Sequence, residues 1–287
     1  MGDSIFALLG RGAGLLWPRN RFLLVPVAAA VLASTAGSLA APSWMSTVSK
    51  EPPGSFPLPR PLRATYSFGW AGLSVAVAQG RFFQPAPDRL ELEGTGRTTG
   101  LARLLWRYDV NYEALTNALT LHPIESNQVE TFYRKTIQTR LSFNSDGVIR
   151  TRTEKTSSGP AQEAKFSFPH LFDLQSAMFY LRSQPLKQGS VHGIVVYPTT
   201  NAYLATATVV GREKISVRAG TYNAIKINLQ LKKVGKKLDL QTHHKFRRAT
   251  IWVSDDADRL ILRIEAQIFI GTVSAELQSV RFENSRS

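Results

Sequence analysis

Apolar and polar residues alternate along much of this chain, which is the pattern of β-strands with one buried face. In the two clearest segments the alternating apolar residues are Ile225, Ile227, Leu229 and Leu231, and then Leu260, Leu262, Ile264, Ala266, Ile268 and Ile270. Shorter alternating runs over 65–83, 89–98 and 131–154 bring the expected total to roughly nine to eleven strands. Asp146-Gly147, inside the last run, predicts a hairpin turn with positive φ angles.

One segment departs from this pattern and predicts the only long helix. Its apolar residues recur at helical spacing and are Leu174, Ala177, Met178 and Leu181. Asp173 can cap the start of this helix, and Pro185 with Gly189 would end it. Phe179 and Tyr180 widen the apolar stripe, so the helix should be enclosed by other structure. A second, short helix is expected over 100–107.

These elements predict a mainly β fold. Short turns join antiparallel neighbours, and an antiparallel meander with one apolar face curls around whatever fills that face. We therefore expect a half-open or closed β-barrel around the central helix 173–182, with a β-sandwich as the alternative.

The N-terminus has the pattern of a secretory signal peptide. Arg19 and Arg21 precede an apolar stretch, and Ser38-Leu39-Ala40 supplies small residues for cleavage after Ala40. An uncleaved anchor over 22–41 is the alternative. We assign 1–40 to the signal peptide, 41–61 to a proline-rich linker, and 62–287 to a single β domain. The protein is thus expected to be exported to the periplasm or cell envelope, with no retained transmembrane segment.

Composition narrows the classes of partner. The formal charge of +14 favours polyanions such as anionic lipid or acidic polysaccharide, although a basic protein with no such ligand is the alternative. The chain has no cysteine, which excludes disulfides and thiolate metal sites. Phosphate-binding loops, zinc-protease motifs and serine-hydrolase elbows are missing, so no cofactor, metal or catalytic residue is predicted. No nucleic acid partner is expected.

A basic segment provides the candidate polyanion site. It consists of Lys232, Lys233, Lys236, Lys237, His243, His244, Lys245, Arg247 and Arg248. Such a loop could bind phosphate or uronate groups, or it could be a solvated loop whose charge prevents edge-to-edge pairing. The adjacent histidines would point to opposite faces of a strand, which argues against a shared metal.

A second set of polar residues could bind a ligand beside the helix: Asp173, Tyr180, Arg182, Glu213 and Trp252. In a cleft, Tyr180 and Arg182 could orient an anionic ligand, and Glu213 could move a proton. In the alternative interpretation these residues are structural: Asp173 caps the helix, Tyr180 packs, and Arg182 pairs with a carboxylate.

The segment 173–189 resembles a family of exported bacterial proteins known as domain of unknown function 3108. The matching features are an Asp-(x)2-Ser-(x)3-Tyr-x-x-Arg helix followed by Pro-Leu-x-x-Gly. Gly211-Arg-Glu213, Gly220-Thr-Tyr222 and Trp252-Val-Ser-Asp255 are further matches, so the resemblance covers about 64–282. It implies a periplasmic or outer-membrane-facing β domain, comparable to half-barrels that carry lipoproteins or lipids, and it implies no activity.

Three function classes follow. The favoured hypothesis is a non-catalytic binding or carrier module for a lipid or other envelope component. A structural or assembly protein of the cell envelope is the second, and an enzyme acting on an acidic polysaccharide is the third. The sequence does not predict the oligomeric state.

Overall fold

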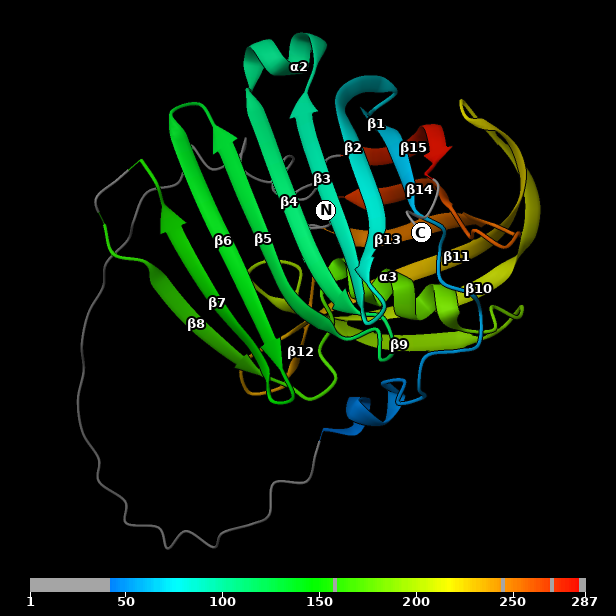
Figure 1. Cartoon of the computed structure of the whole chain (residues 1–287), viewed down its shortest axis with the longest axis horizontal. Helices are drawn as coiled ribbons and strands as arrows, with labels where there is room; N and C mark the ends of the chain where they lie inside the picture. The colour runs from blue at the N-terminus through cyan, green and yellow to red at the C-terminus, as the bar shows by residue number, and fades with distance from the viewer. Residues whose placement is uncertain (1–41, 157–158, 244–245, 269–270, 284–287) are drawn as a thin grey trace, which may run out of the picture.

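The computed structural model describes residues 42–156, 159–243, 246–268 and 271–283. These residues form a 15-stranded sheet, two α-helices and one short 3-10 helix (Figure 1). In chain order the elements are η1 (Ser43–Thr47), β1 (Leu62–Trp70), β2 (Leu73–Ala86), β3 (Arg89–Thr98), α2 (Gly100–Leu105), β4 (Tyr108–Asn117), β5 (Pro123–Phe132), β6 (Lys135–Asn144), β7 (Gly147–Glu154), β8 (Gln162–Ser167), α3 (Leu174–Ser183), β9 (Val191–Val196), β10 (Ala202–Val217), β11 (Gly220–Val234), β12 (Leu240–Thr242), β13 (Phe246–Ser254), β14 (Ile261–Ile268) and β15 (Gly271–Phe282).

The sheet consists of two antiparallel meanders joined at one pair of strands. β1 to β8 run outward from the centre in chain order, and the chain then crosses through α3 to the opposite edge at β9. From β9 the second meander returns until β15 pairs with β1. The predicted mainly β, antiparallel fold is confirmed, and a two-sheet sandwich is not what forms.

The two ends of the sheet overlap instead of closing through hydrogen bonds. β8 and β9 are the two ends of the strand order and do not pair with each other. Phe166 of β8 and Val148 of β7 share a core cluster with Val195 of β9 and Leu204 of β10. The Phe166 and Tyr197 rings lie 5.8 Å apart. The prediction of a fully closed barrel is therefore wrong, because the two end strands pack face against face and do not form backbone hydrogen bonds with each other.

α3 packs on one face of the second meander, which we call the inner face of the sheet. The helix begins at a capping box in which Asp173 Oδ1 accepts from the backbone N–H of Ser176 at 2.7 Å. Ala177, Tyr180 and Leu181 then lie in a cluster with strands β9, β10, β11 and β13. On another side of the helix, Phe179 meets Phe82 of β2, with ring centroids 5.1 Å apart. Both meanders thus contact α3.

The segment 42–61, expected as an extended linker, is hydrogen-bonded along α3 and the edge of β9. Ser49 N–H donates to Gly193 O at 2.8 Å, and Gly54 N–H donates to Ser183 Oγ at 2.9 Å. A Cβ on Gly193 or on Gly54 would lie 2.1 Å from a backbone oxygen of the other segment, so both close approaches require glycine. Further along β9, Phe172 N–H donates to Val195 O at 2.9 Å. The edge of β9 is therefore covered, which limits pairing with other chains.

The hairpin between β6 and β7 forms at the predicted place with a different turn. Asn144 pairs with Gly147, so Ser145 and Asp146 are its central residues. Gly147 has a positive φ of 138°, but Asp146 does not have a positive φ. A Cβ on Gly147 would lie 2.1 Å from Phe166 O, so this glycine serves the close approach of β8 rather than the turn.

The second predicted helix is α2, and it is short. Across the described ranges, no helix has the length and apolarity needed to cross a membrane.

Candidate functional site

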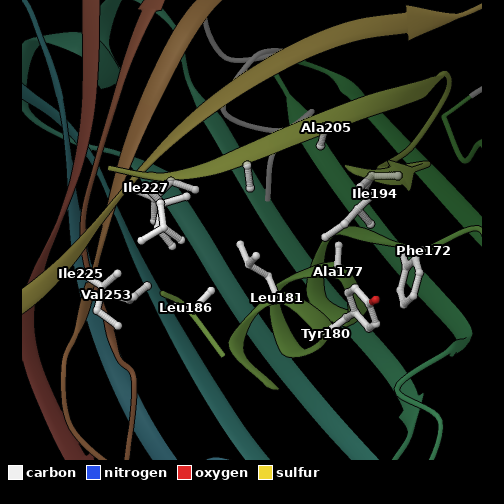
Figure 2. Close-up of a cluster of buried hydrophobic side chains, with 14 residues drawn as sticks. Phe172, Ala177, Tyr180, Leu181, Leu186, Ile194, Ala205, Ile225, Ile227 and Val253 are labelled. Atoms are coloured by element: carbon white, nitrogen blue, oxygen red, sulfur yellow. The ribbon is translucent and has the colours of Figure 1, made fainter. Parts of the chain in front are cut away.

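The inner face of the second meander is an apolar wall. Its central side chains share one buried cluster with residues of α3: Val209, Ile225, Ile227, Ile251 and Val253. Figure 2 labels Ile225, Ile227 and Val253 of this set. A second cluster of Phe246, Ala249, Ala266, Ile268 and Val273 continues this wall, and Leu229 and Leu231 contact both clusters. The alternation at 225–231 is therefore confirmed as a buried face.

The inner face of the first meander is much more polar. Tyr112 fixes which residues belong to it, because the Tyr112 hydroxyl lies 3.5 Å from Asp173 Oδ2 at the start of α3. Tyr112 pairs with Gln128, Gln128 with Thr139, and Thr139 with Arg152. Directly paired residues point to the same face of a sheet. By the same register the inner-face polar residues of β4 to β7, which we call the polar wall, are Tyr108, Tyr112, Thr116, Ser126, Gln128, Glu130, Thr139, Arg150, Arg152 and Glu154.

Some of these polar groups are buried in pairs. The Tyr108 hydroxyl donates to Glu130 Oε1 at 2.8 Å, and both residues are buried. Burial raises the pKa of Tyr112 well above its ordinary value, and the Asp173 carboxylate acts in the same direction. Burial also raises the pKa of Asp173, whereas the hydrogen bonds from Ser176 lower it. The polar wall therefore holds ionisable groups away from bulk water.

Other polar atoms at this face are buried without a hydrogen-bond partner. Both amide atoms of Gln175 are of this kind, as are Thr116 Oγ1 and Arg150 Nε. Gln175 is in the first turn of α3, four residues before Phe179, so the two side chains share a helix face that is directed toward β2. Unpaired buried polar atoms are unfavourable, and in native proteins they occur where a ligand, a water molecule or a functional need compensates.

Tyr180, a predicted ligand residue on α3, is engaged in structural contacts. Its hydroxyl donates to Glu51 O at 3.0 Å, and burial raises the pKa of Tyr180 to about 12. Asp173 caps the helix, as described above. Both residues thus fit the structural interpretation of the sequence pattern.

Arg182 binds backbone carbonyls instead of the expected carboxylate. Its guanidinium donates to Asp258 O at 2.9 Å, to Ala257 O at 3.0 Å and to Pro57 O. Burial, followed by the nearby charge of Arg259, lowers the pKa of Arg182 to about 10. Arg182 therefore connects α3, segment 42–61 and the β13–β14 turn.

Glu213 and Trp252 form a separate group with Lys226. Trp252 Nε1 donates to Glu213 Oε1 at 2.6 Å, and Lys226 Nζ lies 3.3 Å from the same oxygen. The hydrogen bond from Trp252 is the main cause that lowers the pKa of Glu213, and Lys226 acts in the same direction. Trp252 lies between Ile251 and Val253 on β13 and belongs to a different core cluster from theirs, so its side chain points away from α3. The structure does not bring Glu213 and Trp252 together with Asp173, Tyr180 and Arg182.

The basic segment lies at the end of β11, the β11–β12 turn and the start of β13. Lys232, Lys236, Lys237 and Arg248 are exposed, and Lys233 is half-buried. His243 is half-buried, and its Nδ1 accepts from Phe246 N–H at 2.9 Å. His244, Lys245 and the side chain of Arg247 lie outside the described residues.

Two open depressions occur on the first meander. They have volumes of about 330 and 280 Å³ and lie over β2, β3 and β4, and over β1, β2 and β3. Neither is lined by a residue of α3. In the described part of the chain, no group of three or more His, Asp and Glu side chains is arranged to hold a metal ion.

The polar wall was missed by the sequence analysis. The available signal was in β5, where Ser126, Gln128 and Glu130 on one face alternate with Glu125 and Asn127 on the other. A strand with polar residues on both faces inside a folded domain indicates a buried polar surface.

These features define a class: an open, barrel-like antiparallel β domain with one helix packed on its inner face. The chain belongs to the family described as protein of unknown function (DUF3108), whose model matches residues 65–278. The family assignment suggested by 173–189 is confirmed.

One solved structure with a TM-score above 0.5 supports the fold, and a second is similar with a TM-score below 0.5. A β-barrel-like protein of domain of unknown function DUF1849 from Brucella abortus is similar over 80% of this chain and 100% of its own, with 8% identity and a TM-score of 0.52. A DUF1089 family protein from Pseudomonas aeruginosa is similar over 68% of this chain and 93% of its own, with 13% identity and a TM-score of 0.36. No curated protein matches the chain.

Proposed function

We propose that this protein is an exported, non-catalytic binding or carrier module of the cell envelope. Its ligand would have an apolar part and a polar part, as a lipid does. The apolar part would lie on the apolar wall, and the polar part would face the polar wall and the buried amide of Gln175. In this proposal the open sheet acts as a half-barrel, with α3 as the element around which it curves.

The observation that carries the proposal is that both amide atoms of Gln175 on α3 and Thr116 Oγ1 on β4 are buried without a hydrogen-bond partner. A buried donor or acceptor without a partner costs about 1–3 kcal/mol, and here several such atoms are close to the inner face. A ligand with a polar group can supply the missing hydrogen bonds. The adjoining apolar wall supplies the hydrophobic contact that such a ligand also needs.

Co-purification tests the proposal directly. The full chain should be purified without denaturation from the cell envelope of an expressing bacterium and then extracted with organic solvent. Mass spectrometry of the extract should identify one defined amphiphile, at close to one molecule per chain. A protein that carries no small molecule, and that gains no thermal stability from total envelope lipid extract, would contradict the proposal.

Gln175→Leu sharpens the test. Leucine fills a similar volume and removes both unpaired atoms, so the ligand-free variant should be more stable by about 1 kcal/mol and should retain less ligand. The matched control is Gln79→Leu, because Gln79 is exposed on β2. Equal ligand retention in Q175L and Q79L would show that the amide does not contact the ligand.

The export step has its own measurement. We infer that residues 1–40 are removed, so N-terminal sequencing of the mature protein should begin at Ala41. A mature chain that begins at Met1 would support the uncleaved anchor.

The exposed lysines of the β11–β12 region favour a second proposal, a polyanion-binding surface on the same protein. Lys236 and Lys237 are both exposed on a turn, and Lys232 is exposed nearby. Binding to heparin as a generic polyanion should weaken by roughly tenfold when both turn lysines are replaced by glutamate. Unchanged binding of K236E/K237E would remove this proposal and leave the carrier proposal intact.

A further inference from the structure

One end of the first meander forms a distinct rim. In an antiparallel meander alternate connections lie at the same end, so the β1–β2 turn, α2 with its flanking residues, and the β5–β6 turn are neighbours. Figure 1 shows α2 and the β1–β2 turn together at this end. The β4–β5 turn, which carries Leu119, lies at the opposite end of the same strands.

Large apolar side chains are exposed on this rim. Leu101, Leu104 and Leu105 of α2 are 76%, 82% and 79% exposed. Their spacing of three and four residues places them on one face of the helix, directed away from the sheet. Leu73, the first residue of β2, and Tyr133 of the β5–β6 turn are 70% and 65% exposed. Five large apolar side chains at one end form a patch, and such patches mark interaction surfaces.

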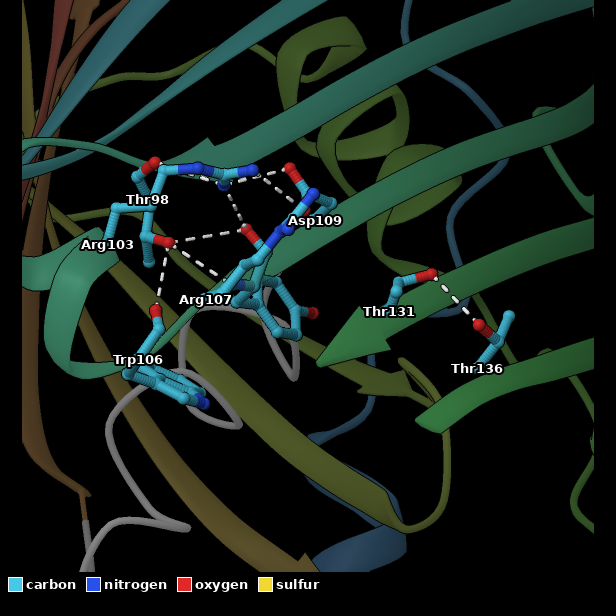
Figure 3. Close-up of polar contacts among 8 residues, drawn as sticks. Thr98, Arg103, Trp106, Arg107, Asp109, Thr131 and Thr136 are labelled. Atoms are coloured by element: carbon cyan, nitrogen blue, oxygen red, sulfur yellow. Dashed lines mark hydrogen bonds and ion pairs between the residues drawn. The ribbon is translucent and has the colours of Figure 1, made fainter. Parts of the chain in front are cut away.

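α2 is held firmly in place, although its leucines contact little. Arg103 donates to both carboxylate oxygens of Asp109, at 3.0 and 3.1 Å, and Thr98 Oγ1 donates to Trp106 O at 3.0 Å (Figure 3). The Tyr133 hydroxyl donates to Leu105 O at 2.8 Å. The leucines are therefore presented by a fixed helix rather than by a loop that could fold back over them.

Positive charge surrounds the apolar patch. Arg107 is exposed and lies 3.8 Å from Asp109, which Arg103 already neutralises. Arg97, Arg134 and Lys155 are also exposed, and the described residues give none of these three an ion pair. Lys155 belongs to this end because its N–H donates to Thr136 O, next to the β5–β6 turn. The rim thus carries uncompensated cations beside leucines and aromatic rings.

We propose that this rim docks on the surface of an anionic lipid bilayer. Leucines on a short helix can enter the headgroup and acyl boundary, while flanking arginines and lysines attract anionic headgroups. Tryptophan and tyrosine, present as Trp106 and Tyr133, prefer this interface. The excess of unpaired cations fits an anionic membrane better than a neutral protein partner. This proposal goes beyond ligand binding at the inner face and does not depend on it.

Single labels on the full chain test the proposal. Because the chain has no cysteine, Leu104→Cys and Leu119→Cys each introduce one site for an environment-sensitive NBD label. The two leucines are matched in exposure, at 82% and 76%, and lie at opposite ends. With vesicles of phosphatidylcholine containing 30% phosphatidylglycerol, the label at 104 should shift to the blue and be quenched by brominated lipid, and the label at 119 should not. No shift at 104, or equal shifts at both sites, would overturn the proposal.

Charge reversal provides the second arm. Arg107→Glu/Arg134→Glu should weaken binding to these vesicles at least tenfold. The reason is that each cation near an anionic surface contributes a factor of roughly five to the affinity. Lys187→Glu/Lys214→Glu is the matched control, since it reverses two exposed charges, in the α3–β9 connection and on β10, outside the rim and outside the basic segment. A loss in K187E/K214E as large as that in R107E/R134E would show that binding follows net charge alone and would overturn the proposal.

Discussion

The two meanders share one sheet but bury different kinds of side chain. The second presents aliphatic residues to α3, and each is enclosed by neighbours of the same kind. The first presents hydroxyl, amide, carboxyl and guanidinium groups on its inner face, some without partners. The second meander therefore stabilises the fold by apolar packing, whereas the buried polar atoms without partners in the first meander destabilise it. Such a cost is retained where function requires the polar groups.

The largest expected effect is in the apolar wall. Ile227 is fully buried on β11 between α3 and β13. Ile227→Ala removes buried methyl groups and leaves a cavity, so the free energy of unfolding should fall by about 2–5 kcal/mol in urea denaturation.

The matched change in the polar wall should act in the opposite direction. Thr116→Val keeps the shape of a fully buried side chain and removes a hydroxyl without a partner, so it should be neutral or stabilise the protein by about 1 kcal/mol. If T116V destabilised the protein as much as I227A, the two walls would not differ in the way described.

A smaller loss is expected where α3 meets segment 42–61. Arg182→Met keeps most of the apolar stem and removes donors to three carbonyls, so the free energy of unfolding should fall by about 1.5–3 kcal/mol. Limited proteolysis should then cut near Pro57 at a lower protease concentration. Arg182→Lys should not restore resistance, because an ammonium group lacks the planar set of donors. Full rescue by lysine would indicate that only the charge matters.

The smallest effect concerns the start of α3 and depends on pH. Burial raises the pKa of Asp173, so between its unfolded and folded pKa values the folded state binds more protons. The contribution of this group is therefore fully present below the unfolded pKa and is lost as pH rises through the folded pKa. Asn is an equally good cap, so D173N should change stability at pH 7 by about 1 kcal/mol or less.

The sign of the pH dependence gives the check. Denaturation midpoints measured from pH 4 to pH 7 should show that D173N gains stability relative to the parent as pH rises. Identical pH profiles for the two proteins would contradict a raised pKa at this position.

Much of the local structure could be predicted because it depends on short-range pattern. Alternation at 225–231 identified a buried strand face, and the Asp173 cap with its apolar stripe identified α3. The number of strands was underestimated in part because β5 carries polar residues on both faces, so its sequence shows no alternation of apolar and polar positions. The exposed leucines of α2 were not singled out, since helical spacing alone cannot distinguish a buried stripe from an exposed one.

The candidate site was harder to predict. Asp173, Tyr180 and Arg182 were selected as polar residues on a buried helix, but their partners are a neighbouring hydroxyl and backbone carbonyls from segments remote in sequence. Gln175 was not selected, because nothing in the sequence reveals that its amide is left without a partner. Hydrogen-bond satisfaction is a property of the assembled fold.

By itself, the sequence determined the antiparallel strands, the capped helix, the family and the basic, cysteine-free character, because each is written in residue type and spacing. Only the tertiary structure decided that the sheet ends overlap rather than close, and that the inner face is polar in the first meander and apolar in the second. It also decided that the exposed leucines gather at one rim. These features depend on which strands become neighbours and how the sheet curves, and long-range packing sets both.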